Sequence, residues 1–329
     1  MVPAFASQPE SPPRKPIPKP IPMKTSIAKN LRILTAGILA IPAIACAGTA
    51  AAGNETPVEK CKESCISGSI GIDVVSLYIS HGVAYENQGA ILQPFGTLSF
   101  QLQEGEGALN GVSLDLGWWN TFHSRHTDAG AVGGGTPSTR AWFEADFSLG
   151  LTFTFLKNFT FSPAYTFYLS PNDAFETAQT LNFKLSYDDS DLLGALALHP
   201  WVNVWWEVEN KIGTGADEGF IYEFGIAPSR SFGDLTVSLP ISAGLGSSDG
   251  YTSAAGEDET YGYFTAGLSL SYALKCIPEC YGEWFLHAGY SYFNLGDGPR
   301  DYGTAAVGGK IRDSRRSEHV FSGGLTVEF

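Results

Sequence analysis

The end of the chain constrains the fold most. The last residues run from Phe321 to Phe329, and the large apolar side chains among them are Phe321, Leu325, Val327 and Phe329. Because residues at even offsets share one face of a β-strand, these four lie on one side. Ser322, Thr326 and Glu328 lie on the other. The pattern predicts a terminal strand with one apolar face and one polar face.

This end resembles the closing strand of bacterial outer-membrane β-barrels, which typically finish on Phe with alternating apolar residues before it. The resemblance implies that the barrel-assembly machinery recognises the end, with an assembly signal formed by Phe321, Leu325, Val327 and Phe329. An ordinary amphipathic edge strand would show the same alternation. These last residues alone leave both interpretations open.

A secretory signal is predicted near the N-terminus. Lys24, Lys29 and Arg32 precede an apolar run over 33–45, and small residues follow it, which is the order of a signal peptide. Pro42 interrupts the run, which is also shorter than the about 20 residues that a membrane-spanning helix needs. The protein is therefore expected to leave the cytoplasm.

The predicted segments follow from this signal. We expect a disordered Pro-rich extension over 1–22, a signal peptide over 23–47, a periplasmic segment over 48–68 and the barrel over 69–329. Met23 is an alternative start, which would make the Pro-rich extension a misassigned piece. Cys46 leaves lipidation open, although no Leu stands three places before it.

The composition excludes some partners and suits many strands. The chain has 20 Lys and Arg against 34 Asp and Glu, a formal charge of −14, so nucleic acid is not an expected partner. A mean hydropathy of −0.02 with 13% aromatic residues and 38 Gly is typical of strands joined by turns. Weak hydropathy with aromatic enrichment also distinguishes transmembrane barrels from apolar helix bundles.

Alternating segments recur along the whole chain. In the clearest one, over 141–155, Phe143, Phe147 and Leu151 share a face opposite Glu144 and Asp146. The expected strands are 70–83, 91–103, 109–122, 140–156, 158–169, 174–187, 197–209, 219–229, 234–245, 261–274, 281–293 and 318–329. The predicted fold is all-β, a single up-and-down antiparallel transmembrane β-barrel of about 12 strands.

The connections support this topology. Those after even-numbered strands are mostly short, such as Lys157, whereas long Gly-, Asp- and Ser-rich connections at 123–139, 210–218, 246–260 and 294–317 follow odd-numbered ones. Short periplasmic turns that alternate with long outer loops are typical of outer-membrane barrels. A soluble sandwich with Greek-key crossovers has no reason to alternate in this way.

The polar face is expected to line a lumen that is too wide for apolar side chains to fill. The pore-lining candidates are Asp115, Glu144, Asp146, Lys184, Glu207 and Glu223. Acids in excess would favour cations, although a solvated lining without selection is the alternative. The expected partners are outer-membrane lipids, the barrel-assembly machinery and small hydrophilic solutes, and a homo-oligomer is possible.

No catalytic motif stands out, and no catalytic, cofactor-binding or metal-binding residue is predicted. The expected function is a porin-like channel for passive diffusion, possibly with cation preference. The alternatives are a structural or adhesive barrel without an open pore, and a lipid hydrolase that uses His287 or His81 beside a Ser on the outer wall. His123 and His126 are expected to be exposed in a loop.

Four cysteines remain after signal cleavage, in two pairs of identical spacing, Cys61 with Cys65 and Cys276 with Cys280. An oxidising compartment favours disulfides over metal thiolates. Local bridges are expected first, and cross-pairing between the two pairs stays open. In either case the expected role is structural.

One internal segment carries a second resemblance. Residues Ser76 to Val83, read Ser-Leu-Tyr-Ile-Ser-His-Gly-Val, resemble the opening strand of the TorF-type porins. That family often has an Asp before the Tyr, where Leu77 stands here. The resemblance covers this strand and the general barrel layout, and it implies a porin-like outer-membrane protein without assigning any functional residue.

Overall fold

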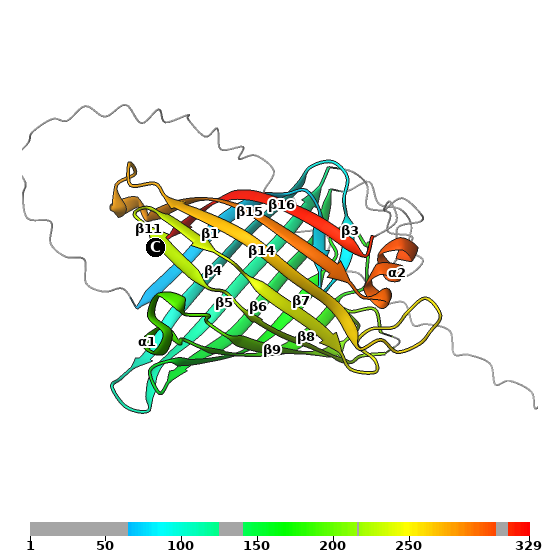
Figure 1. Ribbon diagram of the computed structural model, residues 1–329, viewed down its shortest axis with the longest axis horizontal. Coiled ribbons are helices and arrows are strands. Elements are labelled where there is room, and N and C mark those ends of the chain that lie inside the picture. The colour runs from blue at the N-terminus through cyan, green and yellow to red at the C-terminus, as the bar shows by residue number, and fades with distance from the viewer. Residues whose placement is uncertain (1–64, 125–140, 216, 307–314) are drawn as a thin grey trace, which may run out of the picture. The chain divides into compact units, whose positions relative to one another are not determined.

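The computed structural model describes residues 65–124, 141–215, 217–306 and 315–329. Twelve antiparallel strands form a closed barrel (Figure 1), which confirms the predicted fold. Ten wall strands are continuous: β1 Ile66–Val75, β4 Ile91–Glu104, β5 Leu109–His123, β6 Trp142–Phe155, β7 Phe159–Leu169, β8 Ala178–Tyr187, β9 Trp201–Glu209, β14 Tyr261–Ala273, β15 Glu283–Leu295 and β16 Ser317–Glu328. The extension, the signal peptide, most of the N-terminal segment, Arg125 and His126 lie outside the described residues.

The other two wall strands are each broken at a proline. One consists of β10 Phe220–Ile226 and β11 Ser229–Phe232, and the other of β12 Leu235–Ser238 and β13 Ile241–Gly246. Pro228 and Pro240 stand in the gaps, since proline has no N–H to donate to a neighbouring strand. The Pro228 carbonyl still accepts a hydrogen bond from the Leu239 N–H at 2.9 Å. The sheet therefore continues past both breaks.

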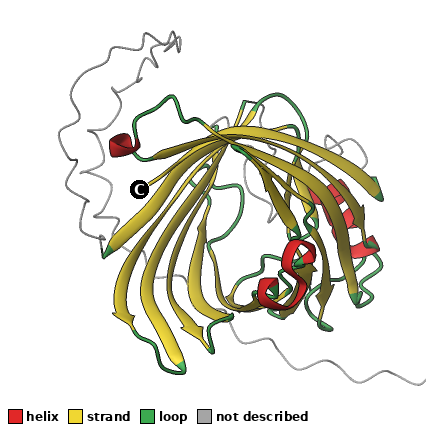
Figure 2. Cartoon of the chain, turned by 60° about the vertical axis from the view of Figure 1, so that its left-hand side comes forward, coloured by secondary structure: helices red, strands yellow, loops and turns green. Residues whose placement is uncertain are grey.

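Pairing of the first and last strands closes the wall, and Figure 2 shows the strands curving around a common axis. β1 is antiparallel to β16 from Ser69 opposite Glu328 to Val75 opposite Ser322. β14 and β15 pair over eleven residues, from Tyr263 to Ala273 of β14. Every wall strand thus has a neighbour on each side, which removes the exposed sheet edge that an open sheet would leave.

Short and long connections alternate as the sequence predicts. Single tight turns join β4 to β5, β6 to β7 and β11 to β12, and the chain ends at the same end of the barrel. We call this the turn end. The opposite, loop end carries the connections around 76–90, 170–177, 210–219 and 247–260 and the helix α2 Asp297–Ala306, which Figure 1 shows beside β3.

The first predicted strand is wrong beyond Val75. The chain leaves the wall there and forms a hairpin of β2 Tyr78–Ser80 and β3 Val83–Glu86, a separate two-stranded sheet. We call residues 76–90 the inner hairpin. It contacts β6, β9 and β10, which lie on other sides of the barrel from β1. A segment that contacts several sides from within must lie in the lumen.

The loop end of the lumen is packed with aromatic side chains. One cluster joins Tyr78 and Ile91 to Phe143, and a second joins Tyr168 and Ile221 to Tyr251. The expectation that a lumen of this width holds only water and polar groups is therefore wrong for this half. The inner hairpin and the loops supply the apolar groups that the wall strands alone could not bring together.

The outer surface of the wall is apolar. Side chains on alternate positions are exposed on every side of the barrel, among them Ile70, Val74, Phe147, Leu149, Val202, Phe224, Leu268, Leu286 and Phe321. Leu149, in the middle of β6, is 53% exposed. Water-soluble monomers rarely expose apolar surface continuously over such an area. Lipid is the environment that this surface matches.

Candidate functional site: the lumen and its inner hairpin

The lumen at the turn end is hollow and polar. In two adjoining cavities, the centre of a water molecule could move through about 520 and 510 Å³. Their walls carry mainly small hydroxyl and amide side chains from β1, β4, β5 and β6, namely Ser67, Ser69, Thr97, Ser99, Gln101, Ser113 and Thr154. Asp115 faces this region and accepts hydrogen bonds from Ser99 at 2.6 Å and from Ser113. This half could hold water and small solutes.

The inner hairpin owes its shape to a two-residue turn. Ser80 pairs with Val83, and the residues between them, His81 and Gly82, have φ angles of 47° and 81°. Positive φ at both central positions is the geometry of the tightest hairpins. Gly82 also lies against the Tyr263 ring, where a Cβ would come within 2.8 Å of the ring. The His-Gly dipeptide was the sequence signal for a turn inside the predicted strand.

One side of the inner hairpin is attached to β6. The Tyr78 hydroxyl donates a hydrogen bond to Glu144 Oε2 at 2.7 Å. The Tyr78 ring contacts the rings of Tyr85 and Trp119, each with centroids 5.3 Å apart. Glu144 was predicted to line an open pore. It is instead buried beneath the inner hairpin.

The tip of the inner hairpin is held on the far side of the lumen. The Tyr251 hydroxyl donates to the His81 carbonyl oxygen at 2.9 Å. The His81 ring lies edge-on to Trp205 with centroids 4.9 Å apart, and its Nδ1 is 3.9 Å from Glu223 Oε1. Since Tyr251 comes from a loop and Trp205 from β9, the tip is fixed by two separate elements.

Glu223 is the polar centre of this attachment. Trp205 Nε1 donates to its Oε2 at 2.6 Å, and the Tyr263 hydroxyl donates to its Oε1. These donors come from β9 and β14, on either side of Glu223 in the wall. The carboxylate is thus mostly enclosed by aromatic side chains, which the sequence could not reveal because they lie far apart in the chain.

Glu207 has a local structural role. Its carboxylate accepts hydrogen bonds from the backbone N–H groups of Ile212, Gly213 and Gly219 at 2.6 to 2.8 Å, and the side chain is 1% exposed. Three donors satisfy most of what a buried carboxylate requires. Glu207 therefore organises the loop after β9 and does not face an open lumen.

The remaining pore-lining candidates differ in surroundings. Asp146 lies near Glu144, and its Oδ1 is buried without a hydrogen-bond partner among the residues that the structure describes. Lys184 is exposed, with Nζ 5.3 Å from the centroid of the Trp201 ring. The candidates are thus not one site. Glu144 is bonded by the inner hairpin, Glu207 by the loop after β9, and Glu223 by residues of β9 and β14.

His287 and His123 lie away from the outer wall. His287 hydrogen bonds to Asp73, and both alternate with exposed apolar neighbours such as Leu286 and Ile72. The pair therefore faces the lumen. His123, expected to be exposed, is 2% exposed and stacks on Phe143 with centroids 4.7 Å apart, because β5 extends further than predicted and ends beneath the inner hairpin.

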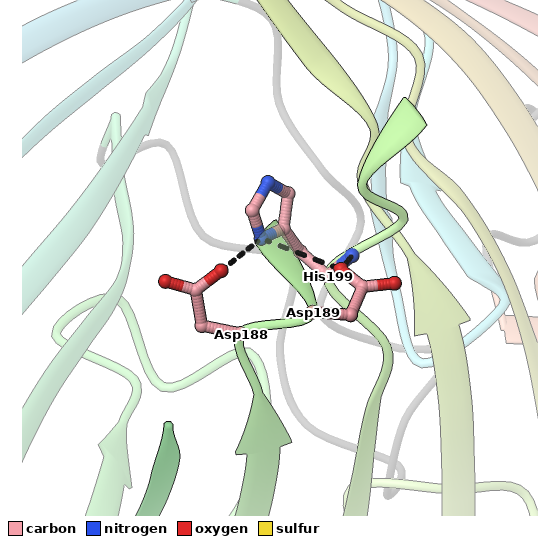
Figure 3. Close-up of side chains that lie close together, drawn as sticks. All are labelled: Asp188, Asp189 and His199. Atoms are coloured by element: carbon pink, nitrogen blue, oxygen red, sulfur yellow. Dashed lines mark hydrogen bonds and ion pairs between the residues drawn. The ribbon is translucent and has the colours of Figure 1, made fainter. Parts of the chain in front are cut away.

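Three side chains of the kinds that bind metal ions lie together at the turn end, and none of them was predicted as a site residue. Figure 3 shows Asp188, Asp189 and His199 between β8 and β9, with His199 Nδ1 3.5 Å from Asp188 and 4.0 Å from Asp189. Burial would raise the pKa of Asp189, but hydrogen bonds from the N–H groups of His199 and Leu198 outweigh it and lower that pKa. These bonds hold the turn around the short α1 helix (Ser190–Leu193) and η2 (Gly194–Leu196).

The structure has no bridge between Cys276 and Cys280, the local pair predicted in the turn after β14. Both side chains are exposed, and Cys280 lies in the 3₁₀ helix η3 Glu279–Tyr281, which follows Pro278. The two cysteines therefore differ in backbone conformation, because Cys280 is part of the 3₁₀ helix and Cys276 precedes it. Cys65 is also exposed, and Cys61 lies outside the described residues, so the connectivity stays a prediction.

The C-terminal residues lie at the closure of the barrel. Phe321 and Phe329 are 60% and 56% exposed on the outer face, as the alternation predicts. The Phe329 N–H and carbonyl oxygen bond to Gly68 at 3.0 and 2.8 Å. Recognition of Phe321, Leu325, Val327 and Phe329 by the assembly machinery stays a prediction.

A closed antiparallel wall with an apolar outside and a polar inside defines the class of this protein, a transmembrane β-barrel of an outer membrane. In the part of the chain that the structure describes, no helix is both long and apolar enough to cross a membrane.

Comparisons with known proteins give fold-level likeness only. No family model matches the chain, and no curated protein matches its sequence. Among solved structures, the NanC porin is 12% identical with a TM-score of 0.42, covering 79% of this chain and 100% of its own. The KdgM porin is 10% identical with a TM-score of 0.39, covering 79% and 99%.

Outer membrane phospholipase A from Escherichia coli is 11% identical with a TM-score of 0.40, covering 79% of this chain and 89% of its own. Similarity at this level identifies no relative. The two porins and the phospholipase have nearly equal TM-scores. The fold is therefore assigned from the strand pairing of this chain, and the proposal of a function starts from the geometry of its lumen.

Proposed function

We propose that this protein is a porin-like channel for small hydrophilic solutes whose loop-end half is closed at rest by the inner hairpin. The observation that carries the proposal is the contrast between the two halves of one lumen. The turn end is hollow and lined by hydroxyl groups, whereas the loop end is occupied by a hairpin whose contacts with the rest of the barrel include those at Tyr78 and His81.

The orientation follows from the connections. Short turns of such barrels face the periplasm and long loops face outward, so the inner hairpin would close the channel from the external side. Solutes would pass when the hairpin leaves the lumen. The polar turn-end half would then form an aqueous vestibule on the periplasmic side.

We further propose a preference for cations. Asp73, Asp115 and Asp146 face the lumen with Lys184 as the accessible base among the residues discussed above, and acids that line a pore attract cations. Reversal potentials under a salt gradient measure this preference. An anion preference would contradict it without affecting the proposed channel.

A barrel without an open pore is the second candidate, and the buried aromatic clusters at the loop end favour it. An enzymatic role has less support. A lipid hydrolase of the kind considered above needs its His and Ser on the outer wall, whereas His287 bonds to Asp73 on the lumen side and His81 is held at the hairpin tip. We propose that the protein is not an enzyme.

Conductance in planar bilayers separates the two candidates. Residues 77–87 would be replaced by a short Gly-Ser linker, and the control would replace the exposed turn 105–108 at the turn end in the same way. For the channel, we expect rare or small openings in the unaltered protein and a large, lasting conductance in the hairpin variant only. A hairpin variant that folds but conducts no ions would establish the barrel without a pore.

A further inference from the structure

A small cavity, in which the centre of a water molecule could move through about 40 Å³, lies between the inner hairpin and the wall at the loop end. It is bounded by elements far apart in the sequence: the inner hairpin, β6, β7, the loop before β8, the loop after β9, and α2. The lining residues are Ser80, Tyr85, Glu144, Tyr168, Phe175, Ala178, Lys211, Ile212 and Tyr302. None of the sites predicted from the sequence includes this combination.

Aromatic rings and one carboxylate dominate the lining. Tyr85, Tyr168, Phe175 and Tyr302 supply four rings, and Glu144 supplies the acid. Burial raises the pKa of Tyr302 to about 12, so its ring is a neutral phenol at physiological pH. The faces of such rings attract organic cations, above all alkylated ammonium groups, and this attraction grows when water is excluded.

Within the part of the chain that the structure describes, Glu144 and the nearby Asp146 have no positively charged partner. Glu144 is 6% exposed and receives a hydrogen bond from the neutral Tyr78 hydroxyl. Asp146, two residues on, has a buried Oδ1 without a hydrogen-bond partner among the described residues. Buried carboxylates are costly unless a cation pairs with them. A ligand that brings a positive charge would compensate Glu144, the acid in the lining.

A positively charged side chain also lines the cavity. Lys211 is exposed, in contrast to Glu144, and its Nζ donates a hydrogen bond to the Gly215 carbonyl at 2.7 Å. That bond fixes the ammonium group at the rim formed by the loop after β9. A simple cation would be repelled there, whereas a ligand with its own carboxylate would be attracted.

We propose that this cavity binds a small zwitterion with an alkylated ammonium group and a carboxylate. The ammonium group lies among the aromatic rings and next to Glu144, and the carboxylate faces Lys211. The biological role of the site rests on the proposed channel, since a solute held beside the hairpin could cross only if the barrel opens. Binding itself requires only the folded barrel.

Isothermal titration of the folded full barrel in detergent tests the site, with trimethylglycine as the zwitterion. Choline supplies the alkylated ammonium alone, butyrate the carboxylate alone, and glucose an uncharged solute. We expect saturable binding of trimethylglycine, weaker binding of choline and none of butyrate or glucose. Binding of glucose in preference to trimethylglycine, or of no probe at all, would overturn the proposal.

Charge-neutralising variants locate the site. Glu144→Gln keeps an acceptor for Tyr78, and we expect it to weaken binding of trimethylglycine about ten- to a hundredfold, as loss of a charged contact does. Lys211→Met should weaken trimethylglycine and leave choline unchanged. The matched controls are Glu283→Gln, a carboxylate of the turn-end cavity, and Lys184→Met.

The controls should bind as the unaltered protein does. Equal losses in Glu144→Gln and Glu283→Gln would place the ligand elsewhere and overturn the site. A folded barrel that binds trimethylglycine but never conducts would remove the proposed channel and leave the site in place. The failure of one proposal is therefore distinguishable from the failure of the other.

Discussion

At the scale of single residues, the acids of the lumen serve two purposes. Glu207 holds the loop after β9 through backbone donors of that same loop. Glu223 lies beside the tip of the inner hairpin and accepts hydrogen bonds from Trp205 and Tyr263, on two other strands. Asp115 lies in the hollow half, where the hydroxyl groups of Ser99 and Ser113 donate hydrogen bonds to it. A carboxylate on the polar face of a strand can thus face the hollow lumen or hold a loop or hairpin in place, depending on which segments pack against it.

The hydrogen bond at the hairpin tip should control opening. Tyr251→Phe removes the bond to the His81 carbonyl oxygen and leaves the ring in place. A typical hydrogen bond contributes about 0.5–1.5 kcal/mol, so we expect the ratio of open to closed channels to rise about two- to tenfold. Single-channel open probability measures this ratio.

Tyr290→Phe is the matched control, because that hydroxyl bonds to His319 in an exposed position. We expect its open probability to equal that of the unaltered protein. If both variants opened the channel equally, the tip contact would have no special part in closure.

At the scale of elements, period-two alternation predicted the wall well. Most strand boundaries lie within a few residues of those expected, because one face of each strand meets lipid and a register error would expose its polar face to it. The inner hairpin could not be separated from β1 in this way, since Tyr78, Ile79 and Ser80 alternate as a wall strand does. Only His81-Gly82 marked the turn, and the rings that receive it are remote in sequence.

The orientation of β6 gives a stability prediction. Leu149 is 53% exposed in the middle of this strand, so Leu149→Arg should place a charge in the hydrocarbon layer and cost about 2–4 kcal/mol. Urea unfolding in lipid vesicles measures the loss in the free energy of unfolding.

The comparison is Leu192→Arg, on the short helix α1 at the turn end, where the side chain is 72% exposed. We expect a change of less than about 0.5 kcal/mol there, as for an ordinary surface position. Similar losses at Leu149 and Leu192 would mean that β6 does not face lipid.

At the scale of the whole molecule, the barrel is closed by its two ends. The N-terminal strand carries the inner hairpin, and the C-terminal strand carries the predicted assembly signal, so closure and plugging involve the same pair of strands. The terminal residue reinforces this junction, since Phe329 bonds to Gly68 in both directions and its ring lies close enough to Gly68 to meet a Cβ at 2.9 Å.

Deletion of Phe329 should therefore impair assembly more than export. We expect a smaller folded fraction in the outer membrane, measured by the heat-dependent shift in gel mobility, with an unchanged amount of processed protein in the periplasm. Glu328→Gln, which keeps the backbone pairing with β1 and β15, is the control. Loss of export in the deletion variant, or normal folding, would contradict the prediction.

Among the described residues, the departure of the inner hairpin from the wall leaves Ser317 to Val320 of β16 with a strand partner on one side only. β1 pairs with β16 as far as Ser322, whereas β15 pairs with β16 on to Ser317. Continuing the register of β1 would set Leu77 opposite Val320 and Ser80 opposite Ser317. The backbone of β16 in this stretch could therefore accept residues of the inner hairpin as a continuation of β1. Release of the hairpin from the lumen could then lengthen the wall instead of leaving a loose loop.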